Sequence, residues 1–181
     1  MSSLTNAQEE KTLFGEDRWK SSGGWGGYRA QWSKINGQTV QISGFHLTGE
    51  YNRKFLIGYN FNFVADYMEL PHNGAARRLR FNWHSMQLGY EIAAHRRIHP
   101  VADLDLGLGR VKVADVGKDP VYVLSPSAGL ELNLFRWFHL NFCGGYRWVS
   151  GVGIAQLQNA DFSGPFGQVT LKFGWSDDFQ H

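Results

Sequence analysis

Histidine and serine are the residue types whose spacing in this chain first suggests catalysis or metal binding. His84 and Ser85 are adjacent, as in an esterase pair that would hydrolyse lipids. Adjacent residues of a β-strand point to opposite faces, so the two side chains cannot hydrogen-bond each other unless a bulge reorients them. His95 and His99 flank two arginines, whose charges would repel a metal ion, and we expect a solvated turn there. We therefore predict no catalytic residue, no metal site and no cofactor.

Eight charged side chains form a second group, whose burial would require a chemical explanation. They fall on the polar sides of alternating segments: Arg29, Glu50, Glu91, Asp103, Asp105, Glu131, Arg147 and Lys172. If these segments fold around one interior, the opposite charges must pair, because isolated ions in a poorly solvated interior are too costly. We predict a polar network of salt bridges that closes the interior. A gated pore or proton path through the same groups is the alternative.

The elements that must position these groups are β-strands. Apolar and polar residues alternate clearly over four segments and less regularly over four more: 28–33, 55–63, 140–148 and 169–175, then 39–51, 79–94, 101–113 and 121–134. A period of two is typical of strands, and no helix-length pattern competes with it. The sequence therefore predicts an all-β fold of eight antiparallel strands.

Three of the less regular strands change parity midway. Their apolar residues occupy alternate positions in the first half and shift by one position in the second. One extra residue in a strand has this effect, so we predict β-bulges near Gly44, Ser85 and Gly109.

Composition limits the class of protein. The chain has 181 residues, a net charge of +2 and a single cysteine. These values favour one domain and give no case for nucleic-acid binding or a disulfide framework. No stretch is long and apolar enough for a membrane helix. We expect a flexible lead-in over 1–22, for which a signal-peptide remnant and an ordinary flexible N-terminus are the two interpretations. A barrel over 23–175 and a short tail over 176–181 should follow.

The connections differ in length at the two ends of the predicted strands. Those at 52–54, 95–100 and 135–138 are short, whereas those at 66–78, 114–120 and 151–164 are longer and rich in Gly, Asp, Asn and Pro. Asn36-Gly37 is the exception, typical of a two-residue hairpin turn. We expect turns at one end of an up-and-down sheet and loops at the other.

The chemistry of the two strand faces favours a transmembrane barrel. The aromatic face is too bulky for a narrow eight-stranded interior, whereas the face with small and charged residues suits one. Aromatic residues near strand ends are expected to form membrane-interface girdles: Trp32, Tyr51, Trp83, Tyr90, Trp137, Trp148 and Trp175. Two other structures stay open: a soluble sandwich, and a lipocalin-like carrier whose aromatic face surrounds an apolar ligand.

Three stretches carry a resemblance to a known family. AGLELNLFRWFHL at 128–140 and GYRWVSG at 145–151 resemble the small outer-membrane β-barrel proteins of Gram-negative bacteria, of the OmpA/OmpX-like eight-stranded kind. GQVTLKFGW at 167–175 is similar to the last strand of that family, whose aromatic end the barrel assembly machinery reads. The resemblance covers about residues 24–175.

The resemblance implies a location and a range of roles. It implies a non-enzymatic, porin-like integral protein of the bacterial outer membrane, with both termini and the short turns in the periplasm. It also implies contact with membrane lipid, including lipopolysaccharide, and with the barrel assembly machinery during insertion. A structural, adhesion or partner-binding role through the extracellular loops at 66–78 and 151–164 is expected, and a narrow solute or ion channel is the alternative.

Overall fold

The computed structural model describes residues 20–177 except residues 67, 73 and 155. The predicted lead-in and tail therefore lie largely outside the described residues. The described chain contains nine strands and one short helix: β1 Ser21–Ile35, β2 Gln38–Tyr51, β3 Phe55–Val64, β4 Met68–His72, β5 Ala75–Glu91, β6 Ile98–Val113, β7 Gly117–Phe135, β8 Phe138–Ser150, α1 Asn159–Phe162 and β9 Gly164–Ser176. Within the described part of the chain, no helix has the length and apolarity needed to cross a membrane.

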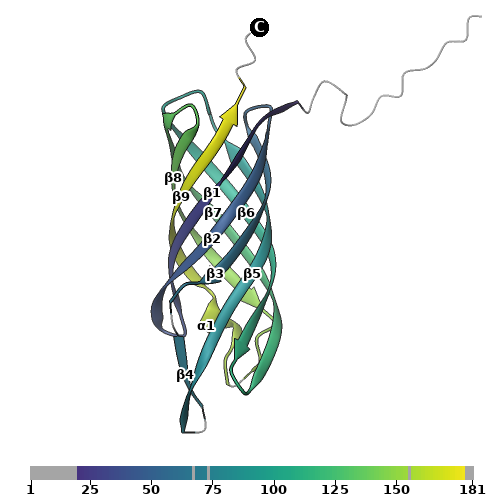
Figure 1. Ribbon diagram of the computed structural model, residues 1–181, viewed down its shortest axis with the longest axis vertical. Coiled ribbons are helices and arrows are strands. Elements are labelled where there is room, and N and C mark those ends of the chain that lie inside the picture. The colour runs from purple at the N-terminus through teal and green to yellow at the C-terminus, as the bar shows by residue number, and fades with distance from the viewer. Residues whose placement is uncertain (1–19, 67, 73, 155, 178–181) are drawn as a thin grey trace, which may run out of the picture.

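Eight of the strands close into an antiparallel barrel (Figure 1). Each pairs with its neighbours along the chain, and β1 pairs with β9 from Gly23 opposite Ser176 to Ser33 opposite Phe166. β3 pairs with β5, so β4 stays outside the closed ring. The eight-stranded up-and-down barrel predicted from the alternation is confirmed.

The two ends of the barrel differ as the connection lengths predict. The described termini lie at the same end as the short turns at 52–54, 92–97 and 136–137 (Figure 1). At the other end, β4 and the first part of β5 form a hairpin arm within the segment expected to be a loop, and α1 lies in the connection before β9. Asn36 and Gly37 have φ of 48° and 75°, as a two-residue hairpin turn requires.

The predicted bulges near Gly44, Ser85 and Gly109 are absent: β2, β5 and β6 keep unbroken register through these positions. The register shifts in the described strands lie instead between Ser21 and Gly23 and between Asn133 and Phe135. The same parity faces inward along each strand, and the chemistry of the interior changes halfway. In β5, for example, Phe81 and Trp83 point inward as Ser85 and Gln87 do.

The interior therefore has two halves. The half near the loop end is apolar and is lined by a continuous cluster of buried side chains, mostly from the loop-end parts of the strands: Ile35, Val40, Ile42, Met68, Leu70, Leu79, Phe81, Trp83, Val111, Val113, Val121, Val123, Val149, Leu157 and Phe162. The half near the termini is polar. Its buried side chains include His46, Thr48, Asn60, Gln87, His99, Asn141, Thr170 and most of the charged set.

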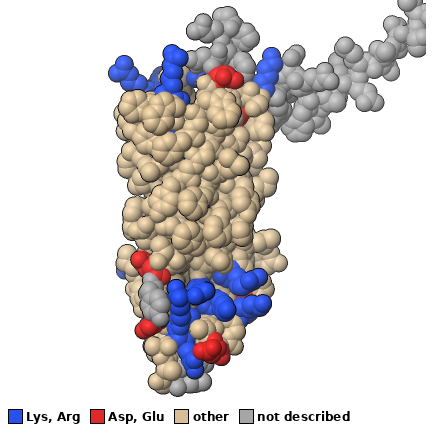
Figure 2. Space-filling model, viewed as in Figure 1, with Lys and Arg blue, Asp and Glu red and all other residues tan. Residues whose placement is uncertain are grey.

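The outer surface carries a broad uncharged band. Figure 2 shows Lys, Arg, Asp and Glu gathered at the two ends of the barrel, with none on the visible surface between them. Large apolar side chains project outward across this band, among them Phe45, Leu47, Met86, Leu106 and Leu108. Such a band around a closed barrel is what hydrocarbon requires of a transmembrane sheet.

Charge introduced into this band will destabilise the protein. The Met86 side chain is 53% exposed on the outer face of β5 and is flanked across the strands by Tyr59 and Leu106. We expect Met86→Arg to lower the free energy of unfolding by about 2–4 kcal/mol in lipid vesicles, because a lipid-facing arginine loses its hydration. Urea titration followed by heat-modifiable gel mobility measures the folded fraction.

Ala76→Arg supplies the matched control on the same strand, because Ala76 is exposed on the hairpin arm outside the uncharged band. Equal loss of stability in both variants would contradict the assignment of the lipid-facing band.

Candidate functional site

Lys172 is the centre of the polar half of the interior. Its Nζ donates to Glu91 Oε1 at 2.8 Å and to Glu131 Oε2 at 2.7 Å, and all three side chains are buried. The ammonium also lies 5.3 Å from the centroid of the Trp25 ring. The contacts join β9 to β5 and β7 across the barrel, so Lys172 ties together strands that do not pair with one another.

Glu50 lies near the seam where the first and last strands meet. Its Oε1 accepts from Ser22 Oγ at 2.8 Å and from Ser176 Oγ at 2.6 Å, and its Oε2 accepts from Trp25 Nε1 at 2.8 Å. Neutral donors on β1 and β9 thus solvate a buried carboxylate of β2. A contact that spans the seam in this way supports closure of the barrel.

A second polar cluster lies midway along the interior. Arg29 pairs with Asp105 at 2.6 Å, and Asp105 also accepts from Asn60 Nδ2 at 2.9 Å. Gln87 connects the cluster to Asp103, to which its Nε2 donates at 2.6 Å. Each of these side chains is buried, so the pairing replaces the water that the charges lose on folding.

Arg147 differs from the other predicted network residues. Its guanidinium is buried in the apolar half, where Nε donates to the Phe162 carbonyl at 2.9 Å and Nη2 to Ser33 Oγ at 3.1 Å. It lies 6.0 Å and 5.8 Å from the ring centroids of Phe81 and Trp83. No carboxylate of the described residues forms an ion pair with it. The expectation that this arginine joins a salt-bridge network is therefore wrong, since the carboxylates lie in the other half.

The connection before β9 folds into the loop end of the barrel. Phe162 is fully buried, and its ring centroid lies 5.3 Å from that of Phe81. Ser163 Oγ accepts from the Val149 amide at 2.9 Å, which holds the segment against β8. Sequence reasoning treated this segment as an exposed loop. Phe162 is a large apolar residue among Asn, Asp and Gly, and this was the signal in the sequence that the segment packs into the barrel.

Most of the predicted interface aromatics project from the outer surface. Trp32, Tyr90, Trp137, Trp148 and Trp175 are exposed, and Tyr51 is partly exposed. Their depth relative to lipid headgroups stays a prediction. For Trp83 the prediction is wrong, because its side chain is 3% exposed and stacks on Phe81 inside the barrel. A bulge at Ser85 would have turned the Trp83 side chain outward, but β5 has no bulge there.

The histidines divide between the two faces. His84 lies on the outer surface next to the Tyr59 hydroxyl and Ser85 lies inside, so they form no esterase pair. His95 is exposed in the short turn, as expected. His99 is 1% exposed and points into the polar half, so the prediction of a solvated turn is wrong at this position. It is the second residue of β6, where strand parity directs the side chain inward.

A row of basic side chains crosses the outer surface near the loop end. Arg80, Lys112 and Lys118 are exposed and stand directly opposite one another on β5, β6 and β7. Arg78 and Arg110 lie two positions away on the same outward face. We call these five residues the basic row. Figure 2 shows Lys and Arg gathered beneath the uncharged band at this end of the barrel.

Loss of the Lys172 charge will destabilise the protein, because two buried carboxylates lose their cation. Lys172→Met leaves Glu91 and Glu131 without their shared cation, and we expect a loss of about 3–5 kcal/mol in the free energy of unfolding. Lys34→Met is the control, because Lys34 is exposed at the loop end. Urea unfolding of the two variants in the same detergent tests the difference. A similar loss in both would show that the interior pairing is unimportant.

Removal of the Phe162 ring will leave a cavity beneath the loop. We expect Phe162→Ala to destabilise the barrel by about 3–5 kcal/mol and to increase proteolysis within 151–163. The control is Phe142→Ala, which removes an outward ring. Limited proteolysis and unfolding midpoints distinguish them. A loop equally resistant in wild type and Phe162→Ala would show that this ring does not hold it.

Comparison with known proteins places the fold. No protein-family model matches the chain, and no curated protein matches it in sequence. Neisserial surface protein A is similar in structure, with a TM-score of 0.58 at 10% identity over 87% of this chain and 98% of that one. Ail, the attachment invasion locus protein of Yersinia pestis, has a TM-score of 0.53 at 16% identity in its complex with the heparin analogue sucrose octasulfate, over 86% and 97% of the two chains. The chain therefore has the fold of these small eight-stranded barrels, and an uncharged apolar band of the kind that crosses a membrane surrounds it.

Proposed function

We propose that this barrel is a non-enzymatic recognition protein whose basic row binds anionic saccharides bearing sulfate or phosphate groups. The observation that carries the proposal is the cross-strand alignment of Arg80, Lys112 and Lys118. Side chains directly opposite on neighbouring antiparallel strands lie about 5 Å apart at Cβ, where like charges repel. A ligand with several negative charges relieves that repulsion.

The neighbours of the row add positive charge. Along the outward face of β5, Arg80 is preceded by Arg78, and along β6, Lys112 is preceded by Arg110. Arg77 pairs with Asp115 at 2.6 Å on the arm and is not part of the row. Arginine offers a planar fork to sulfate or phosphate oxygens, and lysine a compact charge. The row therefore suits a rigid polyanion better than a single anion.

Two sources supply that chemistry at this level of the membrane. Figure 2 shows Lys and Arg next to the uncharged band at the loop end, and phosphate groups of lipopolysaccharide would face them there if this end lies outside the cell. A sulfated saccharide outside the cell would approach the same side chains from solvent. The structure of Ail with a heparin analogue supports the second source by analogy, because the two barrels share a fold.

The alternative functions have less support. A lipocalin-like carrier would need the aromatic face inside, and that face points outward. A channel would need a water path, yet the polar half holds a cavity of about 10 Å³ among Arg29, His46, Gln87 and Lys172, room for at most about one water molecule. Phe162 and Arg147 fill the loop end. Contact with the barrel assembly machinery stays an expectation from the last strand.

Removal of the three aligned charges of the row will weaken polyanion binding. We expect Arg80→Gln/Lys112→Gln/Lys118→Gln to lower the affinity of the detergent-solubilised barrel for sucrose octasulfate by at least about tenfold, because three charges are lost at once. It will also flatten the dependence of binding on salt. Isothermal titration calorimetry at several salt concentrations measures both.

The matched control removes the same charge from the other end of the barrel. Lys54→Gln/Arg96→Gln/Arg97→Gln changes exposed residues of the short turns. Equal losses in the two triple variants would refute the proposed site and leave only net charge as the cause. Titration of both variants with lipopolysaccharide in vesicles then separates the sources. If the Arg80/Lys112/Lys118 variant loses affinity for lipopolysaccharide only, the ligand is the lipid. If it loses affinity for the soluble saccharide only, the ligand is external.

A further inference from the structure

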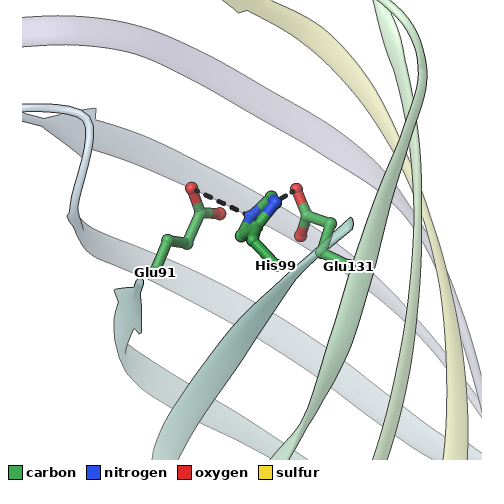
Figure 3. A group of neighbouring side chains, drawn as sticks. All are labelled: Glu91, His99 and Glu131. Carbon is green, nitrogen blue, oxygen red and sulfur yellow. Dashed lines mark ion pairs between the residues drawn. The ribbon is translucent and has the colours of Figure 1, made fainter. Parts of the chain in front are cut away.

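Glu91, His99 and Glu131 come together at the end of the barrel that carries the described termini (Figure 3). Glu91 ends β5, His99 lies at the start of β6, and Glu131 lies on β7 directly opposite His99. His99 Nε2 is 3.9 Å from Glu91 Oε2 and 3.9 Å from Glu131 Oε1. The imidazole thus points between two carboxylates, and all three side chains are buried.

The hydrogen bonds of His99 leave its inner nitrogen unpartnered. Nδ1 lies 3.3 Å from the Arg96 carbonyl, which can only accept, so Nδ1 carries the ring proton. Nε2 has no hydrogen-bond partner, although the side chain is 1% exposed. In this tautomer the Nε2 lone pair faces two carboxylate oxygens, which is repulsive. A positive ion between the three atoms removes the repulsion.

We propose that Glu91, His99 and Glu131 form a binding site for a divalent transition-metal ion of the zinc type. One imidazole nitrogen and two carboxylate oxygens are a ligand set that zinc accepts at about 2.0–2.2 Å, with a fourth position for water. Ligands of a tetrahedral ion at that range stand about 3.4 Å apart, so small side-chain rotations close the present distances. The backbone hydrogen bond at Nδ1 is the usual support for a metal-bound histidine.

The surrounding contacts fit this assignment. Lys172 binds Oε1 of Glu91 and Oε2 of Glu131, whereas His99 lies nearest to the other oxygen of each carboxylate. Glu131 Oε1 lies 2.8 Å from His139 Nδ1, and its second lone pair remains for the ion. This region holds three carboxyl groups, those of Glu50, Glu91 and Glu131, and the ammonium group of Lys172. A divalent ion adds positive charge next to these carboxyl groups.

An opening connects this region with the solvent. A pocket of about 690 Å³ at the termini end is lined by Glu50, Glu91 and His139, with Arg53, His95 and Arg136 among its other residues. Glu91 belongs to both the pocket and the site. A metal ion that enters from the solvent at the termini end would therefore reach the site without crossing the apolar half.

The imidazole ligand separates this site from a general cation site. Calcium and magnesium prefer oxygen ligands, whereas zinc and cobalt accept imidazole nitrogen. We therefore expect Zn²⁺ and Co²⁺ to bind and Ca²⁺ and Mg²⁺ to bind much more weakly. A protonated His99 that simply pairs with both glutamates is the competing arrangement, and it predicts no metal binding at all.

The experiment uses the full chain without an affinity tag, refolded in detergent and freed of metal by a chelator. We expect one Zn²⁺ per chain by mass spectrometry of the metal, and visible absorption bands of Co²⁺ in a low-symmetry nitrogen and oxygen site. His99→Gln should weaken Zn²⁺ binding by about 100-fold or more, because loss of a ligand costs at least as much as loss of its supporting contact. Glu91→Gln should weaken it by at least about tenfold.

His95→Gln is the matched control, because His95 is an exposed histidine at the same pocket. It should leave Zn²⁺ stoichiometry and the Co²⁺ spectrum unchanged. A wild-type chain that binds neither ion, or unchanged binding in His99→Gln, or loss of binding in His95→Gln, would overturn the proposal. If His99→Gln does not fold by heat-modifiable mobility, Glu91→Gln and the wild-type Co²⁺ spectrum decide the question.

Discussion

Closure of the barrel is the constraint on which the rest of this structure depends. In hydrocarbon an unpaired backbone amide or carbonyl costs several kcal/mol, so a transmembrane sheet must have no open edge. The pairing of β1 with β9 meets this requirement. Side chains reinforce the seam, because Ser22, Trp25 and Ser176 from these two strands all donate to Glu50. The narrow interior that closure creates must then be filled.

The side chains that fill the interior differ between the two ends of the barrel. Near the termini, the interior is a set of buried charges held by donors and opposite charges, centred on Lys172 and Arg29. Near the loops, the same inward positions carry Val, Ile, Phe and Trp, and Phe162 completes their packing. A hydrophobic core under the loops gives α1 and its connection an apolar surface to bury. The loop end is therefore a packed structure.

Charges have different roles inside and outside this barrel. Inside, carboxylates and cations compensate each other or are solvated by neutral donors, and Arg147 is held by a carbonyl, a hydroxyl and two aromatic rings. Outside, the basic row places like charges in direct opposition, which stability alone disfavours. Like charges in direct opposition on an exposed sheet support the proposed ligand, whereas paired charges inside the barrel stabilise the fold. In the Glu91–His99–Glu131 group, the buried His99 Nε2 faces two carboxylates and has no hydrogen-bond partner.

Alternation in the sequence by itself determined the eight strands of the barrel, the turn and loop ends and most of the outward apolar face, because a strand's period of two is local. It missed β4 and the hairpin arm. The net charge of +2 and the lack of a long apolar stretch excluded nucleic-acid-binding proteins and helical membrane proteins, because both properties can be read directly from the sequence. Only the tertiary structure decided that Trp83 points inward, that Phe162 fills the loop end, that Arg147 lies apart from the carboxylates and that His99 meets Glu91 and Glu131. These outcomes depend on register and on which strands face each other across the closed interior. A register shift of one residue turns a side chain to the other face of the sheet. Contacts across the interior join residues that are far apart in the chain. The local pattern of apolar and polar residues therefore predicts neither the register nor these contacts.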